Sequence, residues 1–182
     1  MPRCKHCRDK FEQYEFNNKF CKKEDCQVAK GLYNLDKIKK QKQKEWKKRK
    51  AETKEKLKTK KDYEKELQVV FNKYIRLRDQ NKTCISCGTP LKGKFDAGHF
   101  YPVGSYKNLR FNEDNVHAQC VHCNQHKHGA LNEYSLRLPE RIGQERFNKL
   151  NEDRLIELHY SIPELIELKV IYKDKIKNYH FS

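Results

Sequence analysis

The stretch from residue 84 to residue 127 decides how this chain is built. It contains four short motifs, which are CISC at 84–87, DAGHFYP at 96–102, NV at 115–116 and CVHCNQHK at 120–127. Two Cys-x-x-Cys pairs with thirty-two residues between them are a strong signal for zinc, because four thiolates complete a tetrahedral site. A closed Cys4 shell has no open position, so we expect a structural zinc ion held by Cys84, Cys87, Cys120 and Cys123.

A second cysteine quartet lies near the N-terminus and consists of Cys4, Cys7, Cys21 and Cys26. The two quartets use all eight cysteines of the chain. Because the spacing is that of metal ligands and we expect an intracellular protein, zinc is favoured over disulfides. Residues 1–30 are too short to fold on their apolar area alone, so zinc would supply the folding free energy there. The sequence thus predicts two structural Zn²⁺ ions.

The composition points to a polyanionic partner. The 182 residues carry a net charge of +16, and the mean hydropathy is −1.12. Nucleic acid is the first candidate for such a basic chain, and an anionic membrane surface is the second. No apolar run approaches the roughly 18–20 residues that a membrane span needs, and no signal-peptide pattern opens the chain. We therefore expect a cytoplasmic protein that binds DNA and no membrane.

Most of the positive charge is concentrated in residues 31–80, which we predict to be a basic helical arm of one long helix or two in tandem. Residues 32–80 contain neither Gly nor Pro. From Lys37 to Lys61 there are fourteen Lys or Arg and three Glu, a net charge of +11. A solvated charged helix is the plain alternative, but this sign bias favours contact with phosphates. The expected DNA contacts are Lys47, Lys48, Arg49 and Lys50 on the arm, and Arg110 and Lys127 in the central module.

The remaining patterns complete an α+β, mostly helical fold. Apolar residues recur at helical spacing from Tyr63 to Ile75 and predict a helix that packs on the following module or on a second copy of the chain. Segments 95–101 and 108–111 predict a short, irregular hairpin, with a helix from about Cys120 through Lys127. Further helices are expected over Arg146–Leu158 and after Ser161, where Glu164 completes a capping box. The predicted parts are a zinc knuckle (1–30), the basic arm (31–80), the central module (81–138) and C-terminal helices (139–182).

The central module also carries residues suited to phosphodiester hydrolysis. Asp96 and the side-chain oxygen of Asn124 suit a divalent ion with oxygen ligands, Mg²⁺ or Mn²⁺. His99 titrates near neutral pH and can act as a general base toward water. Asn115 can orient the His99 ring, by a hydrogen bond to it or to nearby backbone. Four more histidines cluster here as candidate metal ligands, phosphate contacts or plain surface residues, namely His117, His122, His126 and His128.

These residues resemble the zinc-containing form of the HNH, or ββα-metal, endonuclease motif. His99 and Pro102 match its His-x-x-Pro, Asn115 matches its middle Asn, and Asn124 and Lys127 match its Asn-x-x-Lys. The resemblance implies an HNH ββα-metal module in which His99 is the general base and Asn124 a metal ligand.

In one respect the chain departs from the HNH motif. The motif's acidic ligand directly precedes the His, and that position is Gly98 in this chain. Asp96 has the same parity on a strand as Gly98, so it is the candidate replacement.

A narrower resemblance extends over nearly the whole chain. Asp96-Ala-Gly-His99, the segment from Leu109 to Asn115, and the stretch Cys123-Asn-Gln-His-Lys127 are similar to the NinG/Rap family of recombination proteins from lambdoid and related phages. The resemblance implies a phage-encoded endonuclease that cuts branched DNA, such as Holliday junctions and D-loops, with a divalent metal. A less selective HNH nicking, restriction or packaging enzyme and an inactive zinc DNA-binding protein remain alternatives. Junction resolution needs two opposed cuts, so a homodimer is a further hypothesis.

Overall fold

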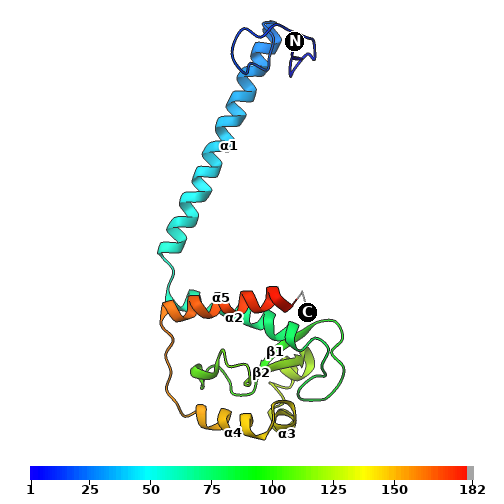
Figure 1. Cartoon of the computed structure of the whole chain (residues 1–182), viewed down its shortest axis with the longest axis vertical. Helices are drawn as coiled ribbons and strands as arrows, with labels where there is room; N and C mark the ends of the chain where they lie inside the picture. Colours follow the sequence, from blue (N-terminus) through cyan, green and yellow to red (C-terminus); the bar gives the residue numbers. More distant parts are fainter. Residues whose placement is uncertain (180–182) are drawn as a thin grey trace. The chain divides into compact units, whose positions relative to one another are not determined.

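The computed structural model describes residues 1–179 and divides into two compact units, Met1–Leu57 and a second that begins at Lys58 (Figure 1). Each unit is described by itself. Among the described residues, none of the helices combines the length and apolar character that a membrane span requires.

The first unit joins the N-terminal cysteine loop to helix α1 (Glu24–Lys56). Phe11 and Phe20 are buried with the cysteines of the loop, and Tyr33 packs against this cluster from the helix. Beyond Tyr33 every residue of α1 is exposed. The helix has acidic residues in its first turn and Lys54 and Lys56 in its last, which suits the helix dipole.

The basic arm predicted over residues 31–80 consists of two helices and not of one continuous helix. Helix α2 (Lys60–Arg78) starts after a short break, and no Gly or Pro causes it. The Asp62 carboxylate accepts hydrogen bonds from the Thr59 backbone N–H (3.0 Å) and from the Thr59 hydroxyl (2.7 Å). Such a cap satisfies donors that would otherwise be left free at a helix start, so a new helix begins at this point.

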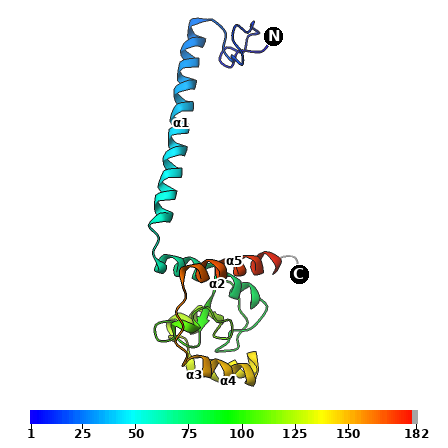
Figure 2. The same cartoon turned by 60° about the vertical axis from the view of Figure 1, so that its left-hand side comes forward.

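The apolar stripe of α2 forms the main core of the second unit. Leu67, Phe71 and Ile75 are completely buried, and α5 (Ile162–Tyr179) lies alongside α2 (Figures 1 and 2). The rings of Phe71 and Tyr172 meet edge to face with centroids 4.9 Å apart. The stripe therefore packs within its own chain, which is the first of the two predicted alternatives. The second half of the predicted 31–80 arm belongs to this unit.

A two-stranded antiparallel sheet lies on α2. Strand β1 (Phe95–His99) pairs with β2 (Val116–Cys120), so that Asp96 stands opposite Gln119 and Gly98 opposite His117. The predicted second strand at 108–111 is wrong, because this segment contains a 3₁₀ turn, η1 (Lys107–Leu109). Leu109 and Phe111 enter two different apolar clusters there, which an extended strand along β1 would not allow. After β2 the chain makes one π-helical turn, η2 (His122–His126), in place of a regular helix.

The C-terminal part is helical, with boundaries that differ from those predicted. Helices α3 (Leu131–Ile142) and α4 (Gln144–Asp153) meet at Gly143, whose φ of +89° suits glycine. Helix α3 therefore starts before residue 139, and α4 ends five residues before Leu158. The predicted start of α5 is confirmed, because Glu164 accepts hydrogen bonds from the backbone and hydroxyl of Ser161 at 2.6 and 2.7 Å.

Candidate functional site

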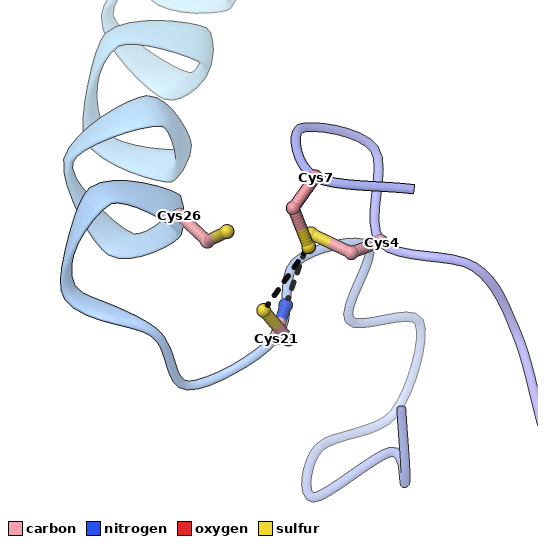
Figure 3. Close-up of side chains that lie close together, drawn as sticks. All are labelled: Cys4, Cys7, Cys21 and Cys26. Atoms are coloured by element: carbon pink, nitrogen blue, oxygen red, sulfur yellow. Dashed lines mark hydrogen bonds between the residues drawn. The ribbon is translucent and has the colours of Figure 1, made fainter. Parts of the chain in front are cut away.

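The eight cysteine side chains gather as two quartets, as predicted. In each quartet the four sulfur atoms lie within 4.8 Å of one another. Figure 3 shows the N-terminal quartet, in which the four side chains point toward one another from the loop and from α1. The Sγ atoms of Cys7 and Cys21 are 3.7 Å apart, and those of Cys87 and Cys120 are 3.9 Å apart. A zinc ion with Zn–S bonds of about 2.3 Å requires sulfur separations of about 3.8 Å, so both quartets fit zinc.

Both quartets begin with the same backbone loop. The Cys4 N–H donates to the Asp9 carbonyl and the Cys84 N–H to the Thr89 carbonyl, each at 2.8 Å. The residue after the second cysteine has a positive φ in both loops, 69° at Arg8 and 72° at Gly88. Backbone N–H groups also point at sulfur, from Cys21 to Cys4 and from Cys120 to Cys84, at 3.4 Å. These donors stabilise thiolates, which are the form that binds a metal.

The cysteines of the N-terminal quartet differ in how readily they ionise: although burial opposes it, hydrogen bonds from backbone N–H groups lower the pKa of Cys4 to about 6. Burial raises the pKa of the Cys26 thiol to about 12, and the sulfurs of the other three cysteines of its quartet act in the same direction. A divalent cation removes this penalty, because it stabilises all four thiolates together. The residues present therefore suit a structural zinc ion at each quartet.

The second quartet fixes the sheet to the turn that follows it. The Ile85 N–H donates to the Ala118 carbonyl at 3.1 Å, which ties the cysteine loop to β2. Cys120 ends β2 and Cys123 lies in η2, so the quartet also sets the path of the chain into that turn. Asn124, directly after Cys123, is placed by this arrangement.

His99 ends strand β1 and is held by the backbone. Its Nε2 lies 3.0 Å from the Arg110 carbonyl oxygen. Because a carbonyl only accepts, this contact assigns the proton to Nε2 and leaves the lone pair on Nδ1. Burial lowers the pKa of His99; the hydrogen bond to the carbonyl opposes this, and the Arg110 charge adds to it. The imidazole is therefore neutral at pH 7, as a general base must be.

Asn115 is a buried brace for the loop between the strands. Its Oδ1 accepts a hydrogen bond from the Tyr101 N–H at 2.7 Å, and its Nδ2 donates to the carbonyls of Tyr101 and Leu109, both at 3.0 Å. Of the two roles predicted for Asn115, the contacts to nearby backbone are present. They fix the segments on both sides of Arg110, whose carbonyl in turn holds His99.

Asp96 and Asn124 come together, as predicted. The Asp96 Oδ2 accepts hydrogen bonds from the Asn124 Nδ2 at 3.0 Å and from the Gln125 Nε2 at 2.7 Å. Within residues 1–179, the groups of three or more Cys, His, Asp or Glu side chains that suit an ion are the two cysteine quartets, and Asp96 belongs to neither. An ion at Asp96 would therefore depend on amide oxygens for its other protein ligands.

The other predicted site residues differ in their exposure and in their contacts within the chain. Lys127 is exposed, as are Lys47, Lys48, Arg49 and Lys50. Arg110 is engaged within the chain, because its guanidinium lies 2.9 Å from the Glu64 carboxylate and donates to Gln68 at 2.8 Å. His122, His126 and His128 are exposed, whereas His117 is buried.

The sequence patterns did not reveal a buried ionic cluster between α2 and β2. Arg78 binds the Asp79 carboxylate through two nitrogens at 2.8 and 2.9 Å, and the Ala118 N–H donates to the same carboxylate at 3.0 Å. Although burial opposes it, the neighbouring His117 ring and the hydrogen bonds from Arg78 hold the pKa of Asp79 well below its usual value. His117 is thus a structural residue that faces Arg78 and Asp79. The adjacent Arg78 and Asp79 near the end of a predicted helix were the sequence feature that could have indicated this cluster.

Comparisons with known proteins identify the family of the chain. The family model described as "Bacteriophage Lambda NinG protein" matches residues 1–180. Over 114 residues the chain is 42% identical to Protein ninG of Escherichia phage lambda and 40% identical to Protein ninG of Salmonella phage P22. These matches cover 63% of this chain and 55–56% of the relatives, so the chain spans about half the length of the curated relatives it matches. No solved structure matches the chain. The chain belongs to the family of the bacteriophage lambda NinG protein.

Proposed function

We propose that this protein is a divalent-metal-dependent endonuclease of the HNH type that hydrolyses a phosphodiester in branched double-stranded DNA. The observation that carries the proposal is His99, a half-buried neutral imidazole whose Nε2 is fixed by the Arg110 carbonyl. Its free lone pair on Nδ1 suits proton abstraction from water.

We assign three separate tasks to His99, to Asn115 and to the pair of Asp96 and Asn124. Nδ1 of His99 takes the proton from the attacking water, and the Arg110 carbonyl stabilises the imidazolium that forms. Asn115 keeps the Arg110 segment in place through the adjacent backbone. Asp96 and Asn124 would hold Mg²⁺ or Mn²⁺, which supplies charge neutralisation at the phosphate and the leaving oxygen.

The positive charge supports binding to the DNA backbone. Helix α1 is exposed from Asn34 to its end and contains Lys47, Lys48, Arg49 and Lys50. Contacts of this kind are salt-dependent and indifferent to base sequence, as recognition of a branch by its shape allows. The choice of Holliday junctions and D-loops as substrates rests on the resemblance to the NinG/Rap family.

One observation favours a different function. Gly98 stands where the HNH motif has its acidic ligand, and Asp96 is not part of a group of three or more Cys, His, Asp or Glu side chains within the described residues. A chain that cannot retain the catalytic ion would be a zinc-dependent DNA-binding protein without nuclease activity.

The test compares a four-way junction with linear duplex of equal length, using zinc-loaded protein with Mg²⁺ or Mn²⁺. We expect the junction to be nicked faster than the duplex. We expect no cleavage of either substrate when EDTA is added after the DNA. Equal rates on both substrates identify a less selective nicking enzyme. Absence of cleavage with every divalent ion, while the junction is bound, contradicts the proposal and favours the DNA-binding function. The mass of the protein in solution then tests the homodimer, which two opposed cuts would require.

A further inference from the structure

The space beside Gly98 is bordered by amide oxygens. A Cβ added at Gly98 would collide with Oε1 of Gln119 and would lie 3.2 Å from Oδ1 of Asn124. Gln119 stands opposite Asp96 across the strand pair, so Gln119, Asp96 and Gly98 share one face of the sheet. The position that an acidic side chain would take in the HNH motif is therefore filled from the neighbouring strand by the end of Gln119.

Oε1 of Gln119 is a buried acceptor without a donor. Gln119 is completely buried, and within the described residues its Oε1 has no hydrogen-bond partner. An amide oxygen that is buried without a donor loses its hydrogen bonds to water and gains none, so native proteins rarely keep one without a reason.

The orientation of the Gln119 amide is fixed by its nitrogen. Nε2 donates to the Gly129 carbonyl at 2.5 Å and to the Ser86 hydroxyl at 2.6 Å. Because the Gly129 carbonyl only accepts, turning the amide over would place two oxygen atoms against each other. Oε1 must therefore face the space beside Gly98.

The Asn124 amide does not supply the missing donor. Its Nδ2 is used by the Asp96 carboxylate, so its Oδ1 faces the same space as the Gln119 oxygen. Turning the Asn124 amide over would give Gln119 a donor but would set Asn124 Oδ1 against the Asp96 carboxylate. Two amide oxygens beside a carboxylate, all presenting lone pairs, form an arrangement that a cation stabilises.

We propose that Gln119 is a ligand of the catalytic divalent ion, and that its Oε1 replaces the acidic side chain missing at Gly98, together with Asp96 and Asn124. The inference rests on the proposed function for the role of that ion. The three side chains offer oxygen only and a single negative charge, which suits Mg²⁺ or Mn²⁺ with several retained waters. Gly98 is then required because a side chain there would displace Gln119.

The test measures Mn²⁺ binding to the zinc-loaded full chain without DNA, from the electron paramagnetic resonance signal of free Mn²⁺. Wild type should bind one Mn²⁺ in addition to its zinc. Gln119→Met, which keeps the side-chain length but has no oxygen, should bind Mn²⁺ at least tenfold more weakly with zinc content unchanged. Gln125→Met is the matched control, because Gln125 is exposed and contacts Asp96 through its amide nitrogen, and its Mn²⁺ affinity should stay within threefold of wild type.

Wild-type affinity in Gln119→Met, or no Mn²⁺ binding by the wild type, overturns the inference. If Gln119→Met does not fold, Gly98→Ala decides. The three heavy atoms nearest to its methyl group belong to the side chains of Gln119 and Asn124, so the backbone can stay while Gln119 is displaced. A tenfold loss of Mn²⁺ affinity there supports the inference, and unchanged affinity overturns it. Cleavage measured on the same preparations separates this inference from the proposed function. If the wild type cleaves and Gln119→Met keeps its Mn²⁺ affinity, only the assignment of Gln119 as a ligand is refuted. If Mn²⁺ binding depends on Gln119 but the wild type does not cleave, only the proposed nuclease activity is refuted.

Discussion

Replacing Asn115 with alanine should remove the brace that holds the loop between the two strands. The side chain is fully buried and makes three hydrogen bonds to backbone, two with Tyr101 and one with Leu109. At about 1 kcal/mol for each bond, Asn115→Ala should lower the free energy of unfolding by about 3 kcal/mol. This is a large part of the roughly 5–15 kcal/mol that stabilises a domain.

Urea unfolding of the zinc-loaded chain measures this loss. With an m-value of about 2 kcal/mol per molar urea, the midpoint should fall by about 1.5 M. Asn112→Ala is the matched control in the same loop, because its half-buried Oδ1 accepts one bond, from the Asp114 N–H at 2.8 Å. Asn112→Ala should lower the free energy of unfolding by about 1 kcal/mol or less. Equal losses in the two variants would refute the reasoning that Asn115 is the principal brace of this loop.

Three further predictions follow from the charges and the metal sites. Zinc analysis should give two ions per chain, and one ion per chain would mean that one quartet does not bind zinc. Chelation of the zinc should unfold the N-terminal loop, which proteolysis would detect as faster cleavage before α1. Changing Lys47, Lys48, Arg49 and Lys50 to glutamine should make DNA binding less dependent on salt. The slope of the logarithm of the binding constant against the logarithm of the salt concentration should fall in magnitude by about 3 to 4, and an unchanged slope would show that α1 does not contact phosphates. Because burial lowers the pKa of His99 below 6.5, the cleavage rate at pH 6.5 should exceed half its plateau and should fall only at lower pH; a half-maximal point above pH 6.5 would contradict a lowered pKa.

Local patterns were sufficient where covalent spacing or capping decides the structure. The two cysteine quartets follow from spacing, and the start of α5 follows from Ser161 and Glu164. The meeting of Asp96 and Asn124 was also predictable, since the cysteine ligands adjoining Asn124 connect it to the hairpin.

Long-range pairing explains what local patterns missed. Strand β2 is recognisable only through its partner β1 and the cysteine loop, whereas 108–111 has a similar composition and forms a turn. The end of α1 has no Gly or Pro and depends on the Thr59–Asp62 contacts. Gln119 belongs to no pattern along the chain, because its proposed role depends on the missing side chain at Gly98 on the other strand.

The most direct test of the account is single-turnover cleavage of a four-way junction by wild type and His99→Ala, with junction affinity measured on the same samples. We predict that His99→Ala binds the junction like wild type, because His99 is half-buried and lies outside the main apolar clusters, and that its cleavage rate falls by about 10²–10⁴-fold. Cleavage by His99→Ala at the wild-type rate would contradict the central claim that this imidazole is the general base.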